Sequence, residues 1–451
     1  MPARQRRWCI VPWKTIPATS AKLRPEKCYL EKGDNVGTDQ SQYVIIGGSA
    51  AGMSAAEAIR ELDSMGTITV FSEESDMPYF RPMIPFVISG KKRPDDLAVI
   101  GQGPYKGVRV DVRLNSRVEK IDTSGQTVTV KDGSEVTYDK LLIATGSRPY
   151  IPPEIEGTDA DGVFALRTLA DAVAAEKRAG EASHAVMLGG GLLNLKAAFA
   201  LLERKLDVTL VVYSPEILSQ LMEPEDAGLI RDALNKAGLN VMTGCSATRI
   251  LSDTGGVKNV VLDNGQELSC QMVCIGKGVR PNVDFLEDSD IKVDQGAVVD
   301  RYTAANIDNV FAAGDVAVTF DPITGERIVT GLWTNAVEMG RCAGYNMAGR
   351  PTEYTGTFGI LNATQVADEP FVSMGIVHTA DTDNEVHVAS KPQAYRKLVF
   401  SPDGKRLVGA IFIGDISNAG MYRYVIRERM PIDKIKSFII DHKLHYGHFL
   451  R

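Results

Sequence analysis

One order of apolar and polar positions occurs twice along the chain, first in residues 42–75, "QYVIIGGSAAGMSAAEAIRELDSMGTITVFSEES". Tyr43–Ile46 is a short apolar run that predicts a buried strand, and Ser54–Leu62 has the composition of a helix. Thr67–Phe71 is rich in β-branched residues and predicts a second strand. Because glycines separate the first strand from the helix, the stretch predicts a strand–turn–helix–strand unit.

The same order returns in residues 184–218, "HAVMLGGGLLNLKAAFALLERKLDVTLVVYSPEIL". Ala185–Leu188 predicts a strand, Leu192–Arg204 a helix and Asp207–Val212 the next strand. Three consecutive glycines, Gly189–Gly191, form the turn. Strands that alternate with helices in this way predict α/β domains with parallel sheets.

The first turn has the residues that a phosphate-binding loop needs. Gly47 allows a tight turn, Ser49 is small enough for a pyrophosphate to approach, and Gly52 lets the helix pack closely on the strand. The N-terminus of the helix adds N–H donors and the positive end of a dipole. Glu73, at the end of the second strand, is placed to accept hydrogen bonds from a ribose. We therefore expect a dinucleotide site here rather than a plain turn.

The second turn departs from this pattern at two points. Asn194 replaces the third glycine, so either the helix and strand lie slightly farther apart or the Asn side chain adds a hydrogen bond. No acid ends the second strand, since Val212 is followed by Tyr213 and Ser214. A carboxylate at this place favours NAD and an arginine favours NADP, so the choice between them stays open. We expect a nicotinamide cofactor here, and the alternative is a relic fold that binds none.

Two further apolar runs end in small or acidic residues. Residues 138–157, "YDKLLIATGSRPYIPPEIEG", predict a buried strand that ends at Ala144–Gly146, and residues 309–317, "NVFAAGDVA", predict one that ends at Gly314 and Asp315. Ligands of open α/β sheets bind beyond the carboxyl ends of the strands. We expect both ends to close the first nucleotide site. The alternative is that Asp315 only caps a following helix.

Composition limits the class of protein. A length of 451 residues suggests two or three domains, and a formal net charge of −7 argues against a nucleic-acid partner. No apolar run reaches the ~18–20 residues that a membrane span needs. The six cysteines form no CxxC pair and no zinc framework, and Cys270 and Cys274 read as small buried residues of a strand. We expect a reducing compartment, the cytoplasm, without structural disulfides.

Residues 1–41 form a basic N-terminal extension with no acid before Glu26. The extension lacks a secretory apolar region, and its scattered prolines argue against the amphipathic helix of a transit peptide. We expect an extended arm; a transit peptide or a wrongly assigned start is the alternative. Trp8, Trp13 and Tyr29, which lie among basic residues, would suit docking on an acidic protein or packing on the parent domain.

The C-terminal region predicts a small mixed domain. Residues 394–415 predict two strands around a turn at Pro402–Gly404, and "NAGMYRYVIRERMPID" predicts a helix that ends before Pro431. The tail holds His442, His445 and His448, whose spacing could place two of them on one helical face. No carboxylate accompanies them, and we predict no metal site.

Five motifs in order, "GGSAAG", "ATGSRP", "GGGLLN", "IGKGVRPN" and "AAGDV", resemble those of the FAD/NAD-linked pyridine nucleotide–disulfide oxidoreductases, from Tyr43 to Gly349. The resemblance implies an α/β fold with two Rossmann-like dinucleotide-binding domains and an α+β C-terminal interface domain. The implied order is a basic N-terminal extension 1–41, a first segment of the FAD-binding domain 42–157, an inserted NAD(P)-binding domain 158–282, a second segment of the FAD-binding domain 283–352 and a C-terminal interface or dimerisation domain 353–451.

Motif position also assigns the cofactor contacts that the resemblance implies. The residues expected to hold FAD, from its ADP moiety to its ribityl chain and ring, are Gly47, Ser49, Ala50, Ala51, Gly52, Glu73, Arg81, Pro82, Val118, Ala144, Thr145, Gly146, Arg148, Gly314 and Asp315. Val118 would contact adenine through its backbone. The residues expected to hold NAD or NADP are Gly189, Gly191, Leu192, Leu193, Asn194 and Gly276, the last near the nicotinamide.

The loop "PYFRPMIPF", residues 78–86, distinguishes subgroups within this superfamily. Members that use a thiol carry "RCG" here; Arg81 matches that pattern, whereas Pro82 stands at the cysteine, and the CxxxxC pair of other members is absent. The loop is similar to that of rubredoxin and ferredoxin reductases, in which the arginine borders the flavin and electrons leave at the flavin edge. The lysine often found after their RP is missing, and Lys91 and Lys92 are too distal to replace it.

Lys196 is another departure. Relatives usually have a glutamate in the "GLE" that follows the second glycine turn, where it can approach the nicotinamide, and Lys196 reverses that charge. The lysine could attract a phosphate of the cofactor or an acid on a partner, or it could be a solvated helix residue.

The resemblance implies an FAD-dependent NAD(P)H:acceptor oxidoreductase. Hydride would pass between nicotinamide and flavin, and electrons would pass between the flavin and a redox protein or iron–sulfur subunit, without a redox-active disulfide. The cofactor carries the chemistry, so no side chain is assigned as acid or base. Arg81 is the candidate for tuning the flavin, because a fixed positive charge would stabilise an anionic reduced ring.

The C-terminal domain resembles one that forms homodimers or docks another subunit. Its sequence is also similar to that of the flavin subunits of multi-subunit aldehyde or 2-oxoacid acceptor oxidoreductases. Three alternatives stay open: a stand-alone NADH oxidase that uses oxygen, a thiol-dependent disulfide reductase, and a flavin-bound interaction protein. The direction of electron flow is open as well.

Overall fold

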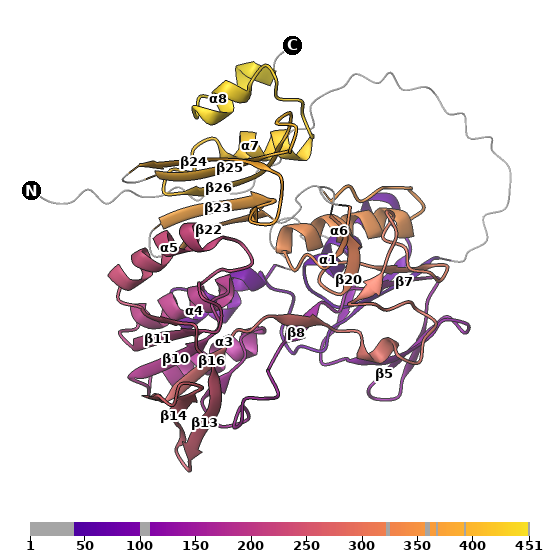
Figure 1. The fold of residues 1–451 in the computed structure, drawn as a ribbon. Coiled ribbons are helices and arrows are strands. Elements are labelled where there is room, and N and C mark those ends of the chain that lie inside the picture. Colours follow the sequence, from indigo (N-terminus) through magenta and orange to yellow (C-terminus); the bar gives the residue numbers. More distant parts are fainter. Residues whose placement is uncertain are drawn as a thin grey trace, which may run out of the picture. The chain divides into compact units, whose positions relative to one another are not determined.

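The computed structural model describes residues 40–99, 109–321, 325–356, 361–366, 369–391 and 394–449. Contacts divide the chain into Met1–Asp39 and Gln40–Arg451. Every helix and strand described here lies within Gln40–Arg451 (Figure 1). The N-terminal arm expected at 1–41, with its two tryptophans and Tyr29, therefore lies outside the described residues except for its last two positions.

The first nucleotide unit is built on a five-stranded parallel sheet. Its strands, in the order in which they pair, are β19 Val310–Ala312, β7 Lys140–Ile143, β1 Gln42–Ile46, β2 Thr67–Phe71 and β3 Asp111–Arg113. The strands predicted at Tyr43–Ile46 and Thr67–Phe71 are confirmed. Although β19 follows the whole second unit in sequence, Val310 lies opposite Leu141 of β7. The sheet is thus completed by residues from beyond that unit.

Two helices of the first unit pack against each other: α1 Ala50–Leu62 and α6 Trp333–Met347. Glycines on α6 allow the close approach. A Cβ on Gly340 would lie 2.2 Å from the carbonyl oxygen of Ala51, and one on Gly344 would lie 2.4 Å from that of Ala55. Both distances are far below van der Waals contact, so any larger residue would push the helices apart.

Smaller elements complete the first unit. The short helical elements are η1 Arg81–Met83, α2 Ile84–Ile88, η2 Pro94–Leu97 and η4 Asp284–Leu286. A three-stranded sheet contains β18 Ala297–Val298, β20 Ala317–Phe320 and β21 Arg327–Ile328. An antiparallel sheet contains β4 Val118–Asp122, β5 Thr127–Val130 and β6 Glu135–Thr137. A two-stranded antiparallel ribbon joins β8 Ser147–Pro149 to β17 Val279–Pro281, where the chain leaves for the second unit and returns from it.

The second nucleotide unit repeats the architecture. Its parallel sheet contains, in pairing order, β12 Asn240–Thr243, β11 Asp207–Val212, β10 His184–Leu188, β16 Met272–Ile275 and β9 Val163–Phe164. Its helices are α3 Leu169–Ala179, α4 Leu192–Glu203 and α5 Pro224–Lys236, and a separate antiparallel sheet contains β13 Ala247–Asp253, β14 Gly256–Leu262 and β15 Glu267–Ser269. The predicted strand, helix and strand of residues 184–218 are confirmed within one residue of each end.

The C-terminal domain is an antiparallel sheet with two short helices and a final turn. The strands pair in the order β22 Leu361–Val366, β23 Glu369–Gly375, β26 Leu407–Ile413, β25 Ala394–Phe400 and β24 Glu385–Lys391. The helical elements are α7 Ala419–Arg427, α8 Lys436–Ile440 and η5 Tyr446–Phe449. The two strands predicted around Pro402–Gly404 and the helix predicted before Pro431 are confirmed.

Alternate residues of this sheet face different cores, as the period of two in a strand requires. Phe371 and Ile411 belong to the same buried cluster as helices of the second nucleotide unit, whereas Val372 and Phe412 pack with α7 and α8. Both faces are therefore covered, and the domain shares a hydrophobic core with the second unit.

A buried lysine reinforces this shared core. The side chain of Lys397 on β25 is 4% exposed, and its ammonium pairs with Glu223, lies 3.6 Å from the carboxylate of Asp226 on α5, and donates to the carbonyl of Val377 at 3.0 Å. A charge so deeply buried is tolerated only with partners of opposite sign. The two carboxylates of the second unit provide them.

The histidines of the tail do not share a helix. His442 follows α8 with a φ of 59°, and only His448 belongs to η5. No cluster of His, Cys, Asp or Glu that could hold a metal occurs in the portion of the chain that the structure describes. Among the same residues, no helix combines the length and apolarity needed to cross a bilayer.

Candidate functional site

The first cavity, of about 320 Å³, lies at the carboxyl ends of β1, β2 and β7. Gly47 has a φ of +116°, and a Cβ there would lie 2.1 Å from the carbonyl oxygen of Ala144. A Cβ on Gly52 would lie 1.9 Å from the carbonyl oxygen of Gly47 itself. Glycine is therefore required at both positions, and the turn brings Ala144–Gly146 directly against the start of α1.

Ser49 is the N-cap residue of α1, and its side chain makes no capping hydrogen bond. The first N–H groups of the helix, which have no partner within the helix, therefore lie beside the cavity that Ser49 lines. Donors of this kind, together with the helix dipole, favour an anionic group such as a pyrophosphate.

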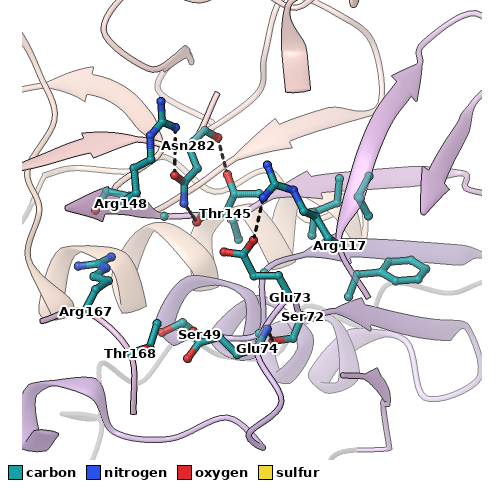
Figure 2. A pocket seen from close by; sticks show the side chains of 18 of the residues that line it. Ser49, Ser72, Glu73, Glu74, Arg117, Thr145, Arg148, Arg167, Thr168 and Asn282 are labelled. Atoms are coloured by element: carbon teal, nitrogen blue, oxygen red, sulfur yellow. Dashed lines mark hydrogen bonds and ion pairs between the residues drawn. The ribbon is translucent and has the colours of Figure 1, made fainter. Parts of the chain in front are cut away.

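Glu73 lies where the sequence predicts, at the end of β2 and on the cavity wall (Figure 2). Its side chain is 58% exposed, and its carboxylate lies 3.7 Å from the guanidinium of Arg117. Val118, the residue after Arg117, is buried and also lines the cavity. An exposed carboxylate can exchange its arginine partner for ribose hydroxyls at low cost, because surface ion pairs are weak.

The far wall of this cavity is held by hydrogen bonds between two distant segments. The hydroxyl of Thr145 donates to the carbonyl of Asn282 at 2.9 Å, and the amide of Asn282 donates to the carbonyl of Thr145 at 2.9 Å (Figure 2). Arg148 lies alongside and pairs with Asp284 at 2.8 Å. Asn282 stands at the end of the motif "IGKGVRPN" but was not predicted as a site residue.

The second cavity, of about 180 Å³, continues from the first. It is lined from the first unit by the start of α1, the loop of Arg81 and Pro82, the segment 313–315 and Trp333 of α6. The second unit contributes Leu193 of α4 and Arg167, which lies between β9 and α3. This cavity is therefore the place at which ligands of the two units can meet.

Paired charges surround the second cavity. Arg81 lines both cavities, and its guanidinium lies 2.6 Å from the carboxylate of Glu74 and donates to the carbonyl of Arg167 at 2.6 Å. Burial acts to lower the pKa of Arg81, but the nearby charge of Glu74 and the phenol of Tyr79 raise it. Tyr79 donates to the second oxygen of Glu74 at 2.6 Å. Arg81 is thus a fixed cation whose charge Glu74 balances.

Asp315 is also held in place by neighbours. Its carboxylate accepts hydrogen bonds from the hydroxyl of Ser147 at 2.9 Å and from the guanidinium of Arg167 at 3.0 Å. The next element is the strand β20, so the alternative that Asp315 caps a following helix is wrong. Gly314, with a φ of +83°, turns the chain so that the carboxylate reaches the cavity.

The structure brings together nearly all the residues predicted to hold FAD, and their contacts with the cofactor stay a prediction. All except Gly52 line one of the two cavities. Glu74, Arg117, Arg167 and Asn282 line them too and were not predicted. The signal for Glu74 was available, since it follows Glu73 directly. Arg167 lies outside every motif, and only the fold places it there.

The second glycine turn uses a different contact. Gly189 has a φ of +107°, and a Cβ there would lie 2.3 Å from the carbonyl oxygen of Gly276. The side-chain amide of Asn194 donates to the carbonyl of Gly189 at 2.7 Å, and a Cβ on Gly276 would lie 2.6 Å from the Cγ of Asn194. Of the two explanations for Asn194, the added hydrogen bond is confirmed.

Of the six residues predicted for NAD or NADP, only Leu193 lines either cavity. At the end of β11, Tyr213 is 73% exposed, and the carboxylate of Glu216 pairs with Arg231 of α5. An acid and an arginine thus both lie near this strand end. The preference between NAD and NADP stays open.

The cysteines of the described chain lie away from both cavities. Cys245, Cys270, Cys274 and Cys342 are all free and buried, and none lines either cavity. Burial raises the pKa of the thiols of Cys270, Cys274 and Cys342 to about 12. These thiols are protonated near neutral pH and are poor nucleophiles. Cys9 and Cys28 lie outside the described residues.

Comparisons with known proteins agree with this arrangement. The family described as pyridine nucleotide-disulphide oxidoreductase matches residues 41–340, and the family described as rubredoxin NAD+ reductase C-terminal domain matches residues 361–430. The chain is 31% identical to the epsilon subunit of NADH-dependent phenylglyoxylate dehydrogenase from Aromatoleum evansii, over 91% of this chain and 97% of that protein. It is also 31% identical to an NADH oxidase from Methanocaldococcus jannaschii, over 81% and 83%.

A solved structure extends the likeness to three dimensions. The NAD-dependent persulfide reductase from A. fulgidus superposes with a TM-score of 0.82 at 27% identity, and the match covers 87% of this chain and 78% of that one. The predicted fold class is confirmed.

Proposed function

Because this chain belongs to the pyridine nucleotide-disulphide oxidoreductase family, we propose that it passes electrons between NAD(P)H and a redox protein or iron–sulfur subunit through FAD, without a redox-active disulfide. The family uses FAD and NAD(P)H, and the chain is an NAD(P)H-dependent flavin oxidoreductase. The proposal concerns the acceptor and the route of the electrons.

The residues of the first cavity fit FAD. Gly47 and Gly52 leave a cradle that any Cβ would fill, the start of α1 presents free N–H groups, and Glu73 is an exposed acceptor. Asp315, which lines the second cavity, is a fixed acceptor. An extended dinucleotide requires hydrogen-bond donors for its pyrophosphate, an acceptor for its ribose and a second acceptor farther along the same path.

FAD supplies the conversion between two-electron and one-electron transfer when it is bound. The chain would orient it and shield it from water. Trp333 lines the second cavity, and its ring meets that of Phe80 edge to face with centroids 4.8 Å apart. Arg81, Arg167 and their carboxylate partners would keep the electrostatic field at the ring constant, because each charge is fixed by a hydrogen bond.

One observation carries the proposal of a route without a thiol: Pro82, not a cysteine, lines the second cavity beside Arg81. The buried thiols of the described residues, with raised pKa values, support it. The match of residues 361–430 to the rubredoxin NAD+ reductase C-terminal domain supports a redox protein as the acceptor. The near full-length match to a dehydrogenase subunit supports the alternative that the acceptor is an iron–sulfur subunit of the same complex.

The test measures NADH- and NADPH-dependent reduction of a rubredoxin, a ferredoxin, oxygen and a coenzyme A persulfide by the purified FAD-loaded chain. We expect an iron–sulfur protein to be reduced at least tenfold faster than oxygen or the persulfide. A variant with all six cysteines changed to serine should keep that rate. Loss of activity in this variant, with FAD content and thermal unfolding both native, would establish the disulfide route instead.

The second candidate is a stand-alone NADH oxidase, and the 31% identity to an archaeal NADH oxidase favours it. It predicts oxygen as the fastest acceptor in the same assay, with no stimulation by an iron–sulfur protein. In a flavin-bound interaction protein, NAD(P)H would reduce the flavin only slowly, and none of the four acceptors would support turnover.

A further inference from the structure

The second cavity is reached by both nucleotide units. The first unit lines it with the start of α1 and the loop of Arg81 and Pro82, and the second unit lines it with Arg167 and Leu193. Hydride passes only between atoms in contact, so the flavin ring and the nicotinamide must meet where both units reach. Under the proposed function the flavin ring therefore lies in this cavity, and charges on the cavity wall act on the reaction.

Two arginines supply positive charge to this wall. Among the described residues that line the second cavity, the cations are Arg81 and Arg167. Arg167 is paired at 3.0 Å with Asp315, which lines the same cavity. Arg81 is paired at 2.6 Å with Glu74, which lines the first cavity and not the second (Figure 2). The charge of Arg81 is thus balanced from outside the cavity in which Arg81 would act on the ring.

Glu74 is held in one geometry by both of its carboxylate oxygens. One oxygen accepts a hydrogen bond from the guanidinium of Arg81, and the other accepts from the hydroxyl of Tyr79, each at 2.6 Å. The same hydroxyl accepts from the backbone N–H of Leu169, the first residue of α3, at 2.9 Å. Tyr79 is 5% exposed, and the side chains of Arg81 and Glu74 are 16% and 21% exposed. Water screens such charges weakly, so the carboxylate cancels most of the field of its partner.

We propose that Glu74 keeps the reduction potential of the flavin low: by balancing Arg81, it withholds the positive field that would stabilise the reduced ring. Hydride from NAD(P)H carries two electrons and one proton to the neutral ring, so the ring gains one negative charge and NAD(P)+ is released. A lone guanidinium at the cavity wall favours this product, and a guanidinium paired at 2.6 Å favours it much less. The inference rests on the proposed function for the place of the ring.

This role of Glu74 has a consequence for the acceptor. Taken alone, Arg81 predicts a stabilised reduced ring, and its pairing with Glu74 reverses that expectation. A ring whose reduced form is less stabilised gives up its electrons more readily. The balanced arginine therefore favours delivery of electrons to an acceptor of low potential, and iron–sulfur centres include such acceptors.

The experiment measures how easily bound FAD is reduced, with no protein acceptor present. The FAD-loaded protein and its variants are titrated without oxygen against a dye of known potential. Glu74→Gln removes the balancing charge and should raise the equilibrium constant for reduction by at least tenfold, which is about 30 mV for two electrons. Glu74→Asp keeps the charge and should stay within threefold of the native protein. Glu119→Gln, which removes an exposed charge from β4, is the matched control and should have no effect.

Arg81→Gln tests the same balance from the other side. It leaves the charge of Glu74 without its cation, so the equilibrium constant should fall by at least tenfold. The double variant Glu74→Gln with Arg81→Gln removes one charge of each sign and should return to within threefold of the native protein. A general loss of structure would not produce this cancellation. Tyr79→Phe removes a hydrogen bond to Glu74 but no charge, and should also stay within threefold.

The proposal is overturned if Glu74→Gln leaves the equilibrium constant unchanged or lowers it. A rise in Tyr79→Phe as large as that in Glu74→Gln overturns it too, because packing rather than charge would then be responsible. FAD content and thermal unfolding are measured on every variant. If only one of Glu74→Gln and Arg81→Gln retains FAD, that variant decides; loss of FAD from both would show that the pair holds the cofactor instead. None of these readouts depends on the acceptor, so failure of this inference is distinguishable from failure of the proposed function.

Discussion

The two nucleotide units follow one plan but fix their glycine turns by different means. In the first unit, Gly52 allows α1 to lie against the carbonyl of Gly47. In the second, Asn194 at the equivalent place donates a hydrogen bond to the carbonyl of Gly189. One turn is fixed by the absence of a side chain and the other by the presence of one. The same backbone can therefore be specified by space or by a hydrogen bond, and a glycine pattern alone finds only the first kind.

The units also differ in how they are joined to their neighbours. Helix α1 packs on α6 through glycines of the same unit, whereas α5 is tied to the C-terminal sheet by the ion pairs of Lys397 with Glu223 and Asp226. Substitutions that remove space should damage the first unit, and substitutions that remove polar contacts should damage the second.

The largest effect should follow Gly52→Ala. The new Cβ would lie 1.9 Å from the carbonyl oxygen of Gly47, so α1 must move away from the turn. We expect FAD content to fall below about a tenth and stability to fall by about 3 kcal/mol or more. Flavin absorbance of the purified protein and thermal unfolding measure both. Gly191→Ala, where a Cβ meets nothing within 4 Å, is the control in the second turn, and equal losses in the two variants would contradict the comparison.

Lys397→Met should come next. The substitution leaves the carboxylates of Glu223 and Asp226 without their cation, and Asp226 is 1% exposed. Breaking a buried pair from one side costs about 3–5 kcal/mol. Urea unfolding should show this loss, while FAD content at low urea stays native because the first unit is untouched. Lys405→Met, at an exposed position of the same domain, is the control. A native unfolding midpoint for Lys397→Met would show that the ion pairs do not hold the second unit.

A smaller effect is expected for Asn194→Ala. The change removes the hydrogen bond to Gly189 and leaves a carbonyl in the turn without its donor, which costs about 1–3 kcal/mol. Binding of NAD(P)H should weaken and FAD content should stay native. Asn194→Gly copies the first unit and should be no better, because Gly276 is shaped around the Asn side chain. Tighter nucleotide binding by Asn194→Gly would refute the role given to the amide.

The smallest effect concerns pH. Burial acts to raise the pKa of Glu223, but hydrogen bonds from Lys397 and Thr379 lower it below its usual value. A carboxylate with a lowered folded pKa stabilises the fold above its unfolded pKa of about 4.3, and this contribution disappears as pH falls through the folded value. Glu223→Gln should therefore reduce the difference in unfolding midpoint between pH 7 and pH 4. Glu225→Gln, exposed on the same helix, should leave that difference native.

The sequence predicts the structural elements that recur along the chain and those that depend only on neighbouring residues. The strands, the glycine turns and the hairpin of the C-terminal domain follow from patterns within about thirty residues. The composition predicts a helix from Ser54, four residues after the actual start of α1 at Ala50, because the glycine pattern assigns Ala50 and Ala51 to the turn. Helical geometry begins directly after Ser49, and the first N–H groups thereby reach the cavity.

What the sequence could not predict depends on distant partners. Arg167 reaches Asp315, 148 residues later, and Arg231 reaches Glu216 from another element. Neither arginine belongs to a motif, and an ion pair leaves no periodic trace in the chain. The pairing of Arg81 has the same origin: the sequence shows that Glu74 follows Glu73, but only the fold shows that Glu74 balances the charge of Arg81.

The ribbon formed by β8 and β17 has a consequence for the history of the chain. Ser147 lies opposite Pro281, so the polypeptide enters and leaves the second nucleotide unit at one point. A segment whose ends lie side by side can be gained or lost by a single genetic event, with only a short turn needed to rejoin the host. The parallel sheet of the host would still have all its strands, because β19, its last strand, follows the insertion. The second unit is in this sense an insertion that leaves the strand order of the host sheet intact.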